Sequence, residues 1–198
     1  MRIINSHSEL TNAMDLAKSE AEKAFSDDRI YMEKYLKAPH HIEIQVFADN
    51  HGNVVSLGER ECSIQRRYQK IIEETPSPFI NETLRQKLSK TAIDITKSCN
   101  YSGAGTVEFL VDKHNQFYFL EMNTRLQVEH PITEMVTGID LVREQLKVAA
   151  GGKLSFTQKD LIPSGHAIEC RIYAEDGFNN FMPSTGKIIE MTIPNGLG

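Results

Sequence analysis

The sequence predicts an α+β fold in which an antiparallel sheet is packed against helices. Some segments carry apolar residues at helical spacing, and others alternate between polar and apolar residues as strands do. Turn-forming residues join neighbouring strand-like segments closely enough to form hairpins. The chain has 198 residues, of which 40% are hydrophobic and 25% are charged, and this composition suits a buried core in one domain or one and a half.

The first half of the chain is predicted to begin with a helix and to continue into a hairpin. Ser8 can cap a helix over residues 8–25, whose apolar residues recur at helical spacing. Residues 30–36 predict a short strand. Residues 41–48 and 54–61 predict the hairpin, because the first segment alternates cleanly and the turn-forming run Asp-Asn-His-Gly-Asn lies between them.

The second half repeats this mixture of helices and strands. Two prolines follow a charged stretch and precede a second amphipathic helix, predicted at residues 81–99. Residues 106–111 and 116–122 predict another hairpin, and residues 139–150 predict a third helix that two glycines end. Two further strands are predicted at residues 166–174 and 187–193.

The register of the second hairpin decides which side chains share a face. Pairing Val111 with Gln116 places Glu108 opposite Phe119 and makes Glu121 its diagonal neighbour, at roughly 7–8 Å between Cα atoms. Alternation then predicts one apolar face. This face is formed by Val107, Phe109, Val111, Tyr118, Leu120 and Met122.

The other face of the hairpin carries a candidate metal site. Two carboxylates as close as those of Glu108 and Glu121 repel each other unless a cation lies between them. Together with Asn123 they offer the hard oxygen ligands that magnesium prefers when phosphates supply the rest. A pair of solvated glutamates on an open sheet face is the alternative interpretation.

A dense polar segment continues this hairpin. Residues 121–131 read Glu-Met-Asn-Thr-Arg-Leu-Gln-Val-Glu-His-Pro, and we expect the segment to begin as a strand and to leave as a loop. A core strand has no use for two carboxylates, two amides and a guanidinium, so the segment indicates a functional site.

This segment and the residues after it resemble the signature of the biotin carboxylases, members of the ATP-grasp superfamily. Further blocks along the whole chain agree with the resemblance. They are Tyr-Met-Glu-Lys-Tyr-Leu at 31–36, His-Ile-Glu-Ile-Gln-Val at 41–46, Arg-Glu-Cys-Ser-Ile-Gln-Arg-Arg at 60–67, Gly-Ala-Gly-Thr-Val-Glu-Phe-Leu at 103–110 and Gly-His-Ala-Ile-Glu-Cys-Arg at 165–171.

The resemblance implies an ATP-grasp core with an antiparallel sheet and packed helices, followed by the start of a biotin carboxylase C-terminal domain. Residues 1–36 would be the remainder of the ATP-grasp lid subdomain, residues 37–163 the main subdomain, and residues 164–198 the beginning of the C-terminal domain. Family members also carry an N-terminal domain and a glycine-rich loop ahead of the region that this chain resembles. We therefore expect a central piece of an enzyme that is inactive by itself.

The resemblance implies an ATP site. Residues 33–36 would form the hinge that meets adenine, and Tyr68 stands where a histidine is common, so it cannot supply that positive charge. The nucleotide-binding residues implied are Glu33, Lys34, Tyr35, Leu36, His41, Gln65, Tyr68, Glu108, Leu110, Glu121 and Val128.

The resemblance also implies the roles of the catalytic residues. Glu108, Glu121 and Asn123 match the ligands of Mg²⁺ or Mn²⁺ that bridge the ATP phosphates. Four further residues match the chemistry of bicarbonate and biotin. Lys70 and Arg125, with the Val128 backbone, would bind bicarbonate, Glu129 would deprotonate it, and Arg171 would stabilise the enolate-like oxygen of biotin.

Each of these roles has a plainer alternative. Lys70 taken alone would favour a solvated surface position. Arg171 alternates with Cys170 and Ile172 on a predicted strand, where an ion pair with Glu169 or Glu175 is the alternative interpretation.

The bulk properties exclude several classes of protein. A net charge of −5 argues against a nucleic-acid scaffold, and no apolar run approaches the length of a membrane span. The three cysteines form no CxxC pair, so neither a zinc site nor a disulfide framework is expected. Buried, reduced thiols in the bacterial cytoplasm or the mitochondrial matrix are the favoured interpretation.

The function implied by the resemblance is the ATP- and bicarbonate-dependent carboxylation of biotin through carboxyphosphate. The implied partners are a biotin carboxyl carrier protein or domain, a carboxyltransferase, and a second copy in a homodimer. Two alternatives stay open. The chain could be a non-catalytic fragment or interaction module, or part of another ATP-grasp ligase of the carbamoyl-phosphate synthetase type. Bicarbonate-stimulated release of phosphate from ATP discriminates between enzyme and module.

Overall fold

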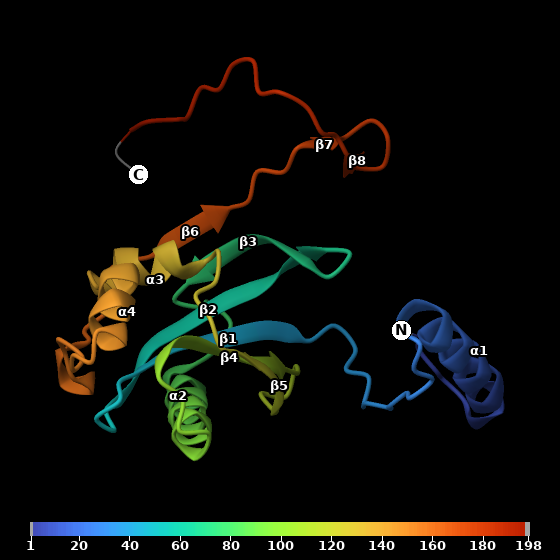
Figure 1. The fold of residues 1–198 in the computed structure, drawn as a ribbon, viewed down its shortest axis with the longest axis horizontal. Helices are drawn as coiled ribbons and strands as arrows, with labels where there is room; N and C mark the ends of the chain where they lie inside the picture. The colour runs from blue at the N-terminus through green and yellow to red at the C-terminus, as the bar shows by residue number, and fades with distance from the viewer. Residues whose placement is uncertain (1, 197–198) are drawn as a thin grey trace.

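The computed structural model describes residues 2–196 and has an antiparallel sheet at its centre (Figure 1). The sheet has six strands in the order β5-β4-β1-β2-β3-β6, and each neighbouring pair is antiparallel. The strands are β1 His40–Ala48, β2 Val54–Arg66, β3 Gln69–Thr75, β4 Gly103–Val111, β5 Phe117–Asn123 and β6 Ala167–Cys170. The predicted α+β class with an antiparallel sheet is therefore confirmed.

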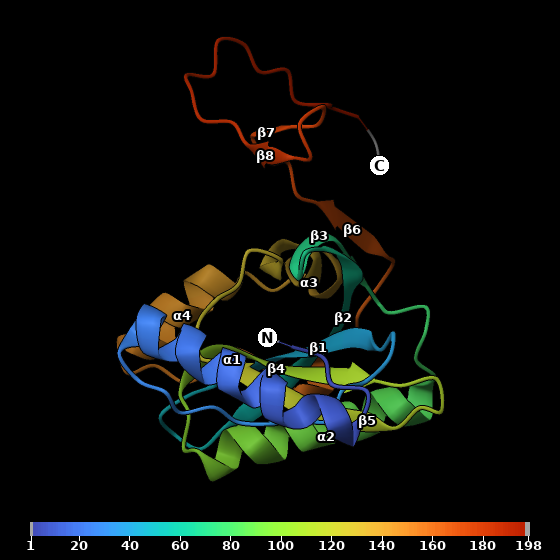
Figure 2. The same cartoon turned by 90° about the vertical axis from the view of Figure 1, so that its right-hand side faces the viewer.

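Helices cover both faces of this sheet. Helix α2 lies below it in Figures 1 and 2, and α3 and α4 lie above it. The helices are α1 His7–Phe25, α2 Glu82–Ser98, α3 His130–Thr137 and α4 Leu141–Ala149, with a short 3-10 helix, η1, at Gln158–Asp160. Within residues 2–196, no helix combines the length and the apolar composition that a membrane crossing requires.

Two larger apolar clusters hold these layers together, with a small third one formed by Ile132, Val136 and Ala167 between α3 and β6. The larger one lies between α2 and the sheet, where Leu84 and Leu88 of the helix pack against Ile42, Ile44 and Phe109 of the strands. The second lies under α4 on the opposite face. It includes Phe47, Val55, Leu57, Leu141 and Val148. Because both faces of β1 are covered, Glu43 and Gln45 are buried as completely as its apolar side chains, and this creates a polar interior above the sheet.

The charged stretch at residues 60–74 forms a hairpin between the end of β2 and β3. Strand β2 continues to Arg66 and β3 begins at Gln69, so only Arg67 and Tyr68 form the turn. Both turn residues have positive φ, at 52° and 65°, as a two-residue turn of type I′ requires. The sequence interpretation placed no strand across this turn, because its charges hide the alternation.

Three predicted strands differ from the structure. Residues 30–36 and 187–193 form no strand, and the strand predicted at 166–174 is shortened to Ala167–Cys170. The first two segments are mostly exposed and pair with no described strand, and alternation alone cannot replace the hydrogen bonds of a neighbouring strand. Between β6 and residue 196, where the description ends, the only strands are the two-residue β7 Glu175–Asp176 and β8 Met182–Pro183.

Helix α3 was not predicted, because the segment was expected to leave the sheet as a loop. The signals for it were present: a proline stands in the first turn, Ile132 and Val136 are spaced for one buried face, and Gly138 ends the helix with φ 69°. This helix matters for function because it closes the polar interior above β1 and β2.

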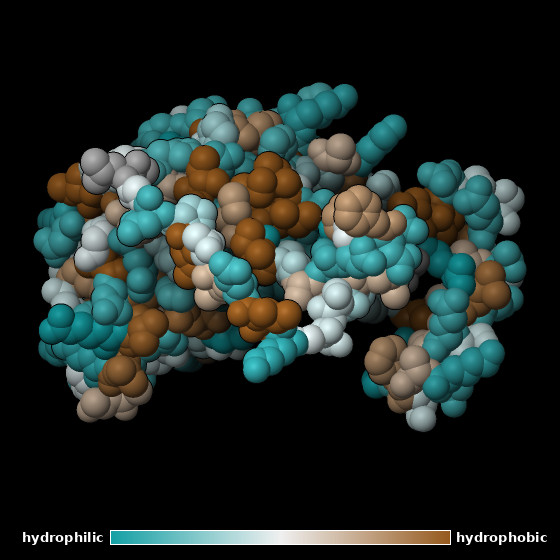
Figure 3. Space-filling model, turned by 90° about the horizontal axis from the view of Figure 1, so that it is seen from above, coloured by the Kyte–Doolittle hydropathy of each residue, from teal (hydrophilic) through white to brown (hydrophobic). Residues whose placement is uncertain are grey.

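Both ends of the chain lie away from this core. Helix α1 has no buried residue and stands apart at the right of Figures 1 and 3. The segment after β6 arches over the molecule, and the face it occupies mixes hydrophilic and hydrophobic residues (Figure 3). Its exposed apolar residues include Ile172, Phe178, Ile188, Ile189, Met191 and Ile193. Apolar exposure of this extent is typical of contact surfaces.

Candidate active site

The β4–β5 hairpin contains a register shift that the sequence did not reveal. Val111 pairs with Phe117, one residue later than predicted. The ring of Phe109 contacts the rings of Phe117 and Phe119, with centroids 5.6 and 6.4 Å apart. Phe117 and Phe119 therefore lie on the face of the sheet that carries Phe109, where Phe117 packs against the core and Phe119 stays 55% exposed. Tyr118 lies on the other face, and the predicted assignment of these three residues to faces was wrong.

The shift also changes the position of the two acidic residues. It falls directly after Glu108, so that Glu108 lies opposite Glu121 and not opposite Phe119. Directly opposed residues have Cβ atoms about 4.5–5.5 Å apart, closer than the predicted diagonal arrangement. The repulsion that called for a cation is thus stronger than predicted.

The predicted metal ligands come together at this point. The Asn123 amide donates hydrogen bonds to Oε1 of Glu108 and to Oε1 of Glu121, each at 3.0 Å. Glu108 is buried and Glu121 is exposed, so the group opens from the interior toward solvent. Two carboxylates and an amide oxygen at such an opening fit Mg²⁺ or Mn²⁺, which keep further positions for phosphate oxygens or water.

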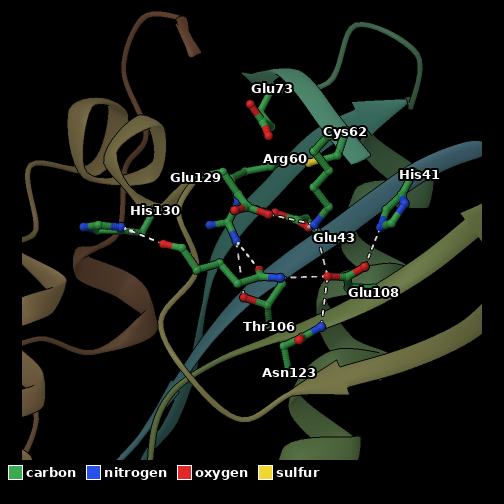
Figure 4. A network of polar contacts seen from close by, with 12 residues as sticks. His41, Glu43, Arg60, Cys62, Glu73, Thr106, Glu108, Asn123, Glu129 and His130 are labelled. Carbon is green, nitrogen blue, oxygen red and sulfur yellow. Dashed lines mark hydrogen bonds and ion pairs between the residues drawn. The ribbon is translucent and has the colours of Figure 1, made fainter. Parts of the chain in front are cut away.

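Glu108 is held in its ionised form. His41 Nε2 lies 2.5 Å from one carboxylate oxygen, and Gln127 and Lys70 donate to the other at 2.8 and 3.1 Å (Figure 4). Burial by itself would raise the pKa of Glu108, but the His41 hydrogen bond and the Lys70 charge outweigh it and lower the pKa to about 2.

Lys70 lies among three carboxylates. Its ammonium group donates to Glu43, to Glu108 at 3.1 Å and to Glu129 at 2.7 Å, and only 12% of its side chain is exposed. Burial would lower the pKa of Lys70, but the surrounding carboxylates raise it, so the lysine stays charged. The alternative of a solvated surface lysine is therefore wrong.

Glu129 and Arg171 form the second half of this cluster. Glu129 precedes α3 and is 2% exposed. Its Oε1 accepts from Lys70, and its Oε2 accepts from Arg171 Nη2 at 2.9 Å. Arg171 Nε donates to Glu73 at 2.7 Å. Arg171 therefore hydrogen-bonds neither Glu169 nor Glu175, the partners considered from the sequence, and Glu175 pairs instead with Arg66.

The sequence interpretation missed the residue on which this interior is built. Arg60 is fully buried opposite Glu43 in the β1–β2 ladder, and its Nε donates to that carboxylate at 2.5 Å. Its other nitrogens reach four neutral acceptors. These are Gln45 at 2.7 Å, Thr133 at 2.9 Å, Gln127 at 3.1 Å and Thr106 at 3.2 Å. Arg60 thereby links both strands to α3 and to the loop before it (Figure 4). The sequence signal that could have indicated a buried cation was the presence of an acid, Glu43, and an amide, Gln45, at alternate positions of β1.

Some predicted nucleotide residues lie around Glu108. Gln65 donates to His41 Nδ1 at 3.0 Å, which orients the imidazole that contacts Glu108. Leu110 is opposite His41 in the β1–β4 ladder and is half-buried. Lys34 reaches the same face from the segment before β1, where its ammonium group donates to the Tyr118 hydroxyl at 3.1 Å.

Other predicted site residues are exposed at the margin. Arg125 donates to the Asn123 side chain at 3.2 Å and is therefore next to the predicted metal ligands. Val128 is 61% exposed, and Tyr68 is 81% exposed in the β2–β3 turn. Glu33 and Tyr35 are exposed, and Leu36 is half-buried, in the segment before β1. The structure thus brings the metal and catalytic candidates together, whereas Tyr68 and the hinge residues stand on the surface.

The three cysteines are all described, and none forms a disulfide. Cys62 is buried, and burial raises the pKa of its thiol well above the ordinary value. Cys99 and Cys170 are exposed, so the expectation that all three thiols are buried was wrong.

Comparison with known proteins places this chain in a family. Residues 1–157 match the family of the carbamoyl-phosphate synthase L chain, ATP binding domain. The chain belongs to this ATP-binding domain family. The match covers most of the chain, including β1 to β5 and the metal and catalytic candidates other than Arg171.

Relatives within the family are biotin carboxylases and subunits of biotin-dependent carboxylases. The chain is 52% identical to biotin carboxylase of Haemophilus influenzae, covering 100% of this chain and 44% of that protein. It is 53% identical to the mitochondrial methylcrotonoyl-CoA carboxylase subunit alpha of Mus musculus, covering 98% of this chain and 27% of that protein.

A solved structure shows the same fold. It is the biotin carboxylase domain dimer of Hydrogenobacter thermophilus 2-oxoglutarate carboxylase, in complex with MgADP, ADP and bicarbonate. It has 46% sequence identity and a TM-score of 0.92, and the match covers 100% of this chain and 44% of that one. This chain thus spans less than half the length of the relatives that it matches, and the resemblance to biotin carboxylases is confirmed.

Proposed function

We propose that the complete protein to which this chain belongs carboxylates biotin on a carrier, using ATP and bicarbonate through carboxyphosphate. The observation that carries the proposal is a cluster of charged side chains centred on Glu129. Glu129 accepts hydrogen bonds from Lys70 and Arg171, and Lys70 also donates to the ionised Glu108. Relatives with about half of their residues identical are carboxylases of this kind.

The nucleotide end of the site is formed by the β4–β5 hairpin. Glu108, Glu121 and Asn123 would hold a divalent cation, which supplies positive charge to the phosphates while the γ-phosphoryl group is transferred. The His41 hydrogen bond and the Lys70 charge keep Glu108 ionised and therefore ready to bind that cation. His41 and Gln65, with the exposed hinge before β1, would line the nucleotide on this side.

The bicarbonate end is formed by Glu129 and the cations around it. Both oxygens of Glu129 accept hydrogen bonds from cationic side chains, which fixes the direction of this carboxylate. A carboxylate held in position can accept the proton of bicarbonate when the substrate comes within hydrogen-bond reach. Lys70 and Arg125, with the Val128 backbone, would bind the anion from the solvent side.

Arg171 connects this chemistry to the carrier-bound substrate. Its side chain is 19% exposed, and its guanidinium is held by Glu73 and Glu129. A fixed guanidinium at the edge of a closed site can stabilise negative charge that develops on the ureido oxygen of biotin.

The proposal includes an organisation into three parts. Residues 37–163 would be the main ATP-grasp subdomain, residues 1–36 part of the lid subdomain and residues 164–198 the start of the C-terminal domain. This is supported by α1, which buries no residue, and by the exposed apolar side chains after β6. The partners would be a biotin carboxyl carrier, a carboxyltransferase and a second copy in a homodimer, in the bacterial cytoplasm or the mitochondrial matrix.

The description of the matched family favours one second candidate, a ligase of the carbamoyl-phosphate synthetase type. Release of phosphate from ATP, measured on the complete protein with and without bicarbonate and with and without free biotin, separates the candidates. Biotin carboxylation predicts cleavage that depends on bicarbonate and is accelerated by biotin. Cleavage that biotin leaves unchanged and ammonia accelerates would favour the second candidate, and we expect little or no cleavage from this chain by itself.

A further inference from the structure

Two acidic residues beside Arg171 have no role in the chemistry proposed above. Glu73 on β3 and Glu169 on β6 are directly opposite each other in the β3–β6 ladder. Their side chains leave the same face of the sheet, with Cβ atoms about 4.5–5.5 Å apart, and like charges in such a position destabilise a sheet. Glu73 is fully buried and Glu169 is half-buried.

Each of these glutamates has one buried oxygen, Oε2, without a hydrogen-bond partner among residues 2–196. The other oxygen of Glu73 accepts from Arg171 Nε at 2.7 Å. Buried polar atoms in native structures are normally hydrogen-bonded, so two such atoms on neighbouring side chains require an explanation. One proton held between the two Oε2 atoms provides a partner for both, because a protonated carboxyl donates and an ionised one accepts.

The charged groups around Glu73 and Glu169 favour the state in which the two carboxylates hold one proton between them. The charged and titratable groups that face it are Arg171 after β6, Glu129 and His130 at the start of α3, and Arg60 on β2. Arg171 is already shared between Glu73 and Glu129.

The remaining arginine is also engaged, since Arg60 is bonded to Glu43 at 2.5 Å. Burial and the neighbouring charge of Glu129 raise the pKa of Glu169. Burial likewise raises the pKa of Glu73, in spite of its bond to Arg171.

We propose that Glu73 and Glu169 share a single proton and act as positioning residues for Arg171. Glu73 is the ionised member that holds Arg171 Nε, and Glu169 is the protonated member that donates to Glu73. Arg171 then faces one negative charge on each side, from Glu73 and Glu129, and stays between them. Loss of the shared proton adds a second negative charge on the β6 side and draws Arg171 away from Glu129. The positioning role rests on the proposed function, whereas the shared proton does not.

The first test compares thermal stability and needs no activity. A carboxyl group whose pKa is raised by folding contributes stability below its unfolded pKa, and that stability is lost as pH rises through the folded pKa. Glu169→Gln replaces the carboxyl with a neutral amide that still donates to Glu73. We expect this variant of the complete protein to have a Tm higher by at least about 2 °C near neutral pH. Below the ordinary glutamate pKa of about 4.3 the two Tm values should converge.

Glu74→Gln is the matched control. Glu74 is the next residue of β3, points to the other face and accepts from His166 at 3.0 Å, so its replacement should not raise Tm. A lower Tm for Glu169→Gln near neutral pH, or a difference that does not vary with pH, would show that Glu169 is ionised and overturn the shared proton. Infrared spectroscopy gives a second readout, since a carboxyl C=O band should be present near neutral pH in the wild-type protein and in Glu74→Gln and be missing from Glu169→Gln.

The second test addresses positioning. The assay is bicarbonate-dependent ATP cleavage as a function of pH. In the wild-type protein kcat/KM should decline at alkaline pH, and in Glu169→Gln this decline should occur at a higher pH. At neutral pH the kcat of this variant should stay within about twofold of the wild-type value. Glu73→Gln removes the charged acceptor of Arg171 and should lower kcat/KM about tenfold or more, the scale of one hydrogen bond to a charged group. An unchanged pH profile in Glu169→Gln would refute the positioning role. If the wild-type protein cleaves no ATP with bicarbonate, the proposed function fails, while the Tm comparison still decides the shared proton.

Discussion

Replacement of Arg60 tests whether the buried polar interior organises the site. Arg60 is fully buried, and its five hydrogen bonds reach Glu43, Gln45, Thr106, Gln127 and Thr133. Removing one member of a buried ion pair costs about 3–5 kcal/mol, because the other charge is left in a medium of low polarity. We expect Arg60→Met to lower the stability of the sheet by that amount. Arg60→Lys keeps the charge but cannot reach five acceptors, and it should cost about 2 kcal/mol.

Hydrogen–deuterium exchange of the complete protein measures this effect locally. The amides of β1 and β2 lie in the ladder that joins Glu43 to Arg60. A loss of 3 kcal/mol or more corresponds to exchange that is faster by roughly 100-fold or more in Arg60→Met. Bicarbonate-dependent ATP cleavage should fall as well, because Gln127 and Thr133 anchor the segment that carries Glu129.

Arg29→Met serves as the control, because Arg29 is exposed and pairs with Asp27 outside the sheet. Its exchange in β1 and β2 should match that of the wild-type protein. Exchange in Arg60→Met that stays within about tenfold of the wild-type rate would mean that the interior tolerates the loss of its central cation. The argument that Arg60 organises the site would then be wrong.

Three further predictions concern the site itself. Glu121→Gln should weaken binding of the magnesium nucleotide, measured by isothermal titration calorimetry. The loss should exceed the roughly 10–100-fold seen when a residue that only supports a metal ligand is removed. Glu74→Gln should leave this binding unchanged. Glu129→Gln should lower bicarbonate-dependent ATP cleavage by about two orders of magnitude or more, since the proton acceptor is lost; near wild-type rates would refute its role. The pKa of Glu108 is lowered to about 2, so its ionised form stabilises the fold above the ordinary glutamate pKa, and this stability is lost as pH falls toward 2. A pH series of Tm should therefore show an acid-induced loss of about 3 kcal/mol that is absent from Glu108→Gln, and identical acid profiles would contradict the assignment.

Local patterns in the sequence were sufficient for the elements whose periodicity is strong. Helices α1 and α2, the β1–β2 hairpin and the approximate positions of β4 and β5 were predicted within a few residues. The resemblance to biotin carboxylases, read from blocks of residues, is confirmed by relatives along the whole chain. These features depend on residues close to one another in the chain, and their signals survive without any knowledge of what packs against them.

Tertiary structure decided the features that depend on distant residues. The shift after Glu108 cannot be read from alternation, because a one-residue change of register moves side chains to the other face without changing the sequence pattern. The contact between Arg60 and Glu43, and the closure of α3 over it through Thr133, join residues that no local pattern connects. Residues 30–36 alternate like a strand but have no strand beside them. Composition and spacing thus determined which elements form and which chemistry is present, whereas burial and cross-strand pairing determined which charges meet, because both arise only when segments far apart in the chain come into contact.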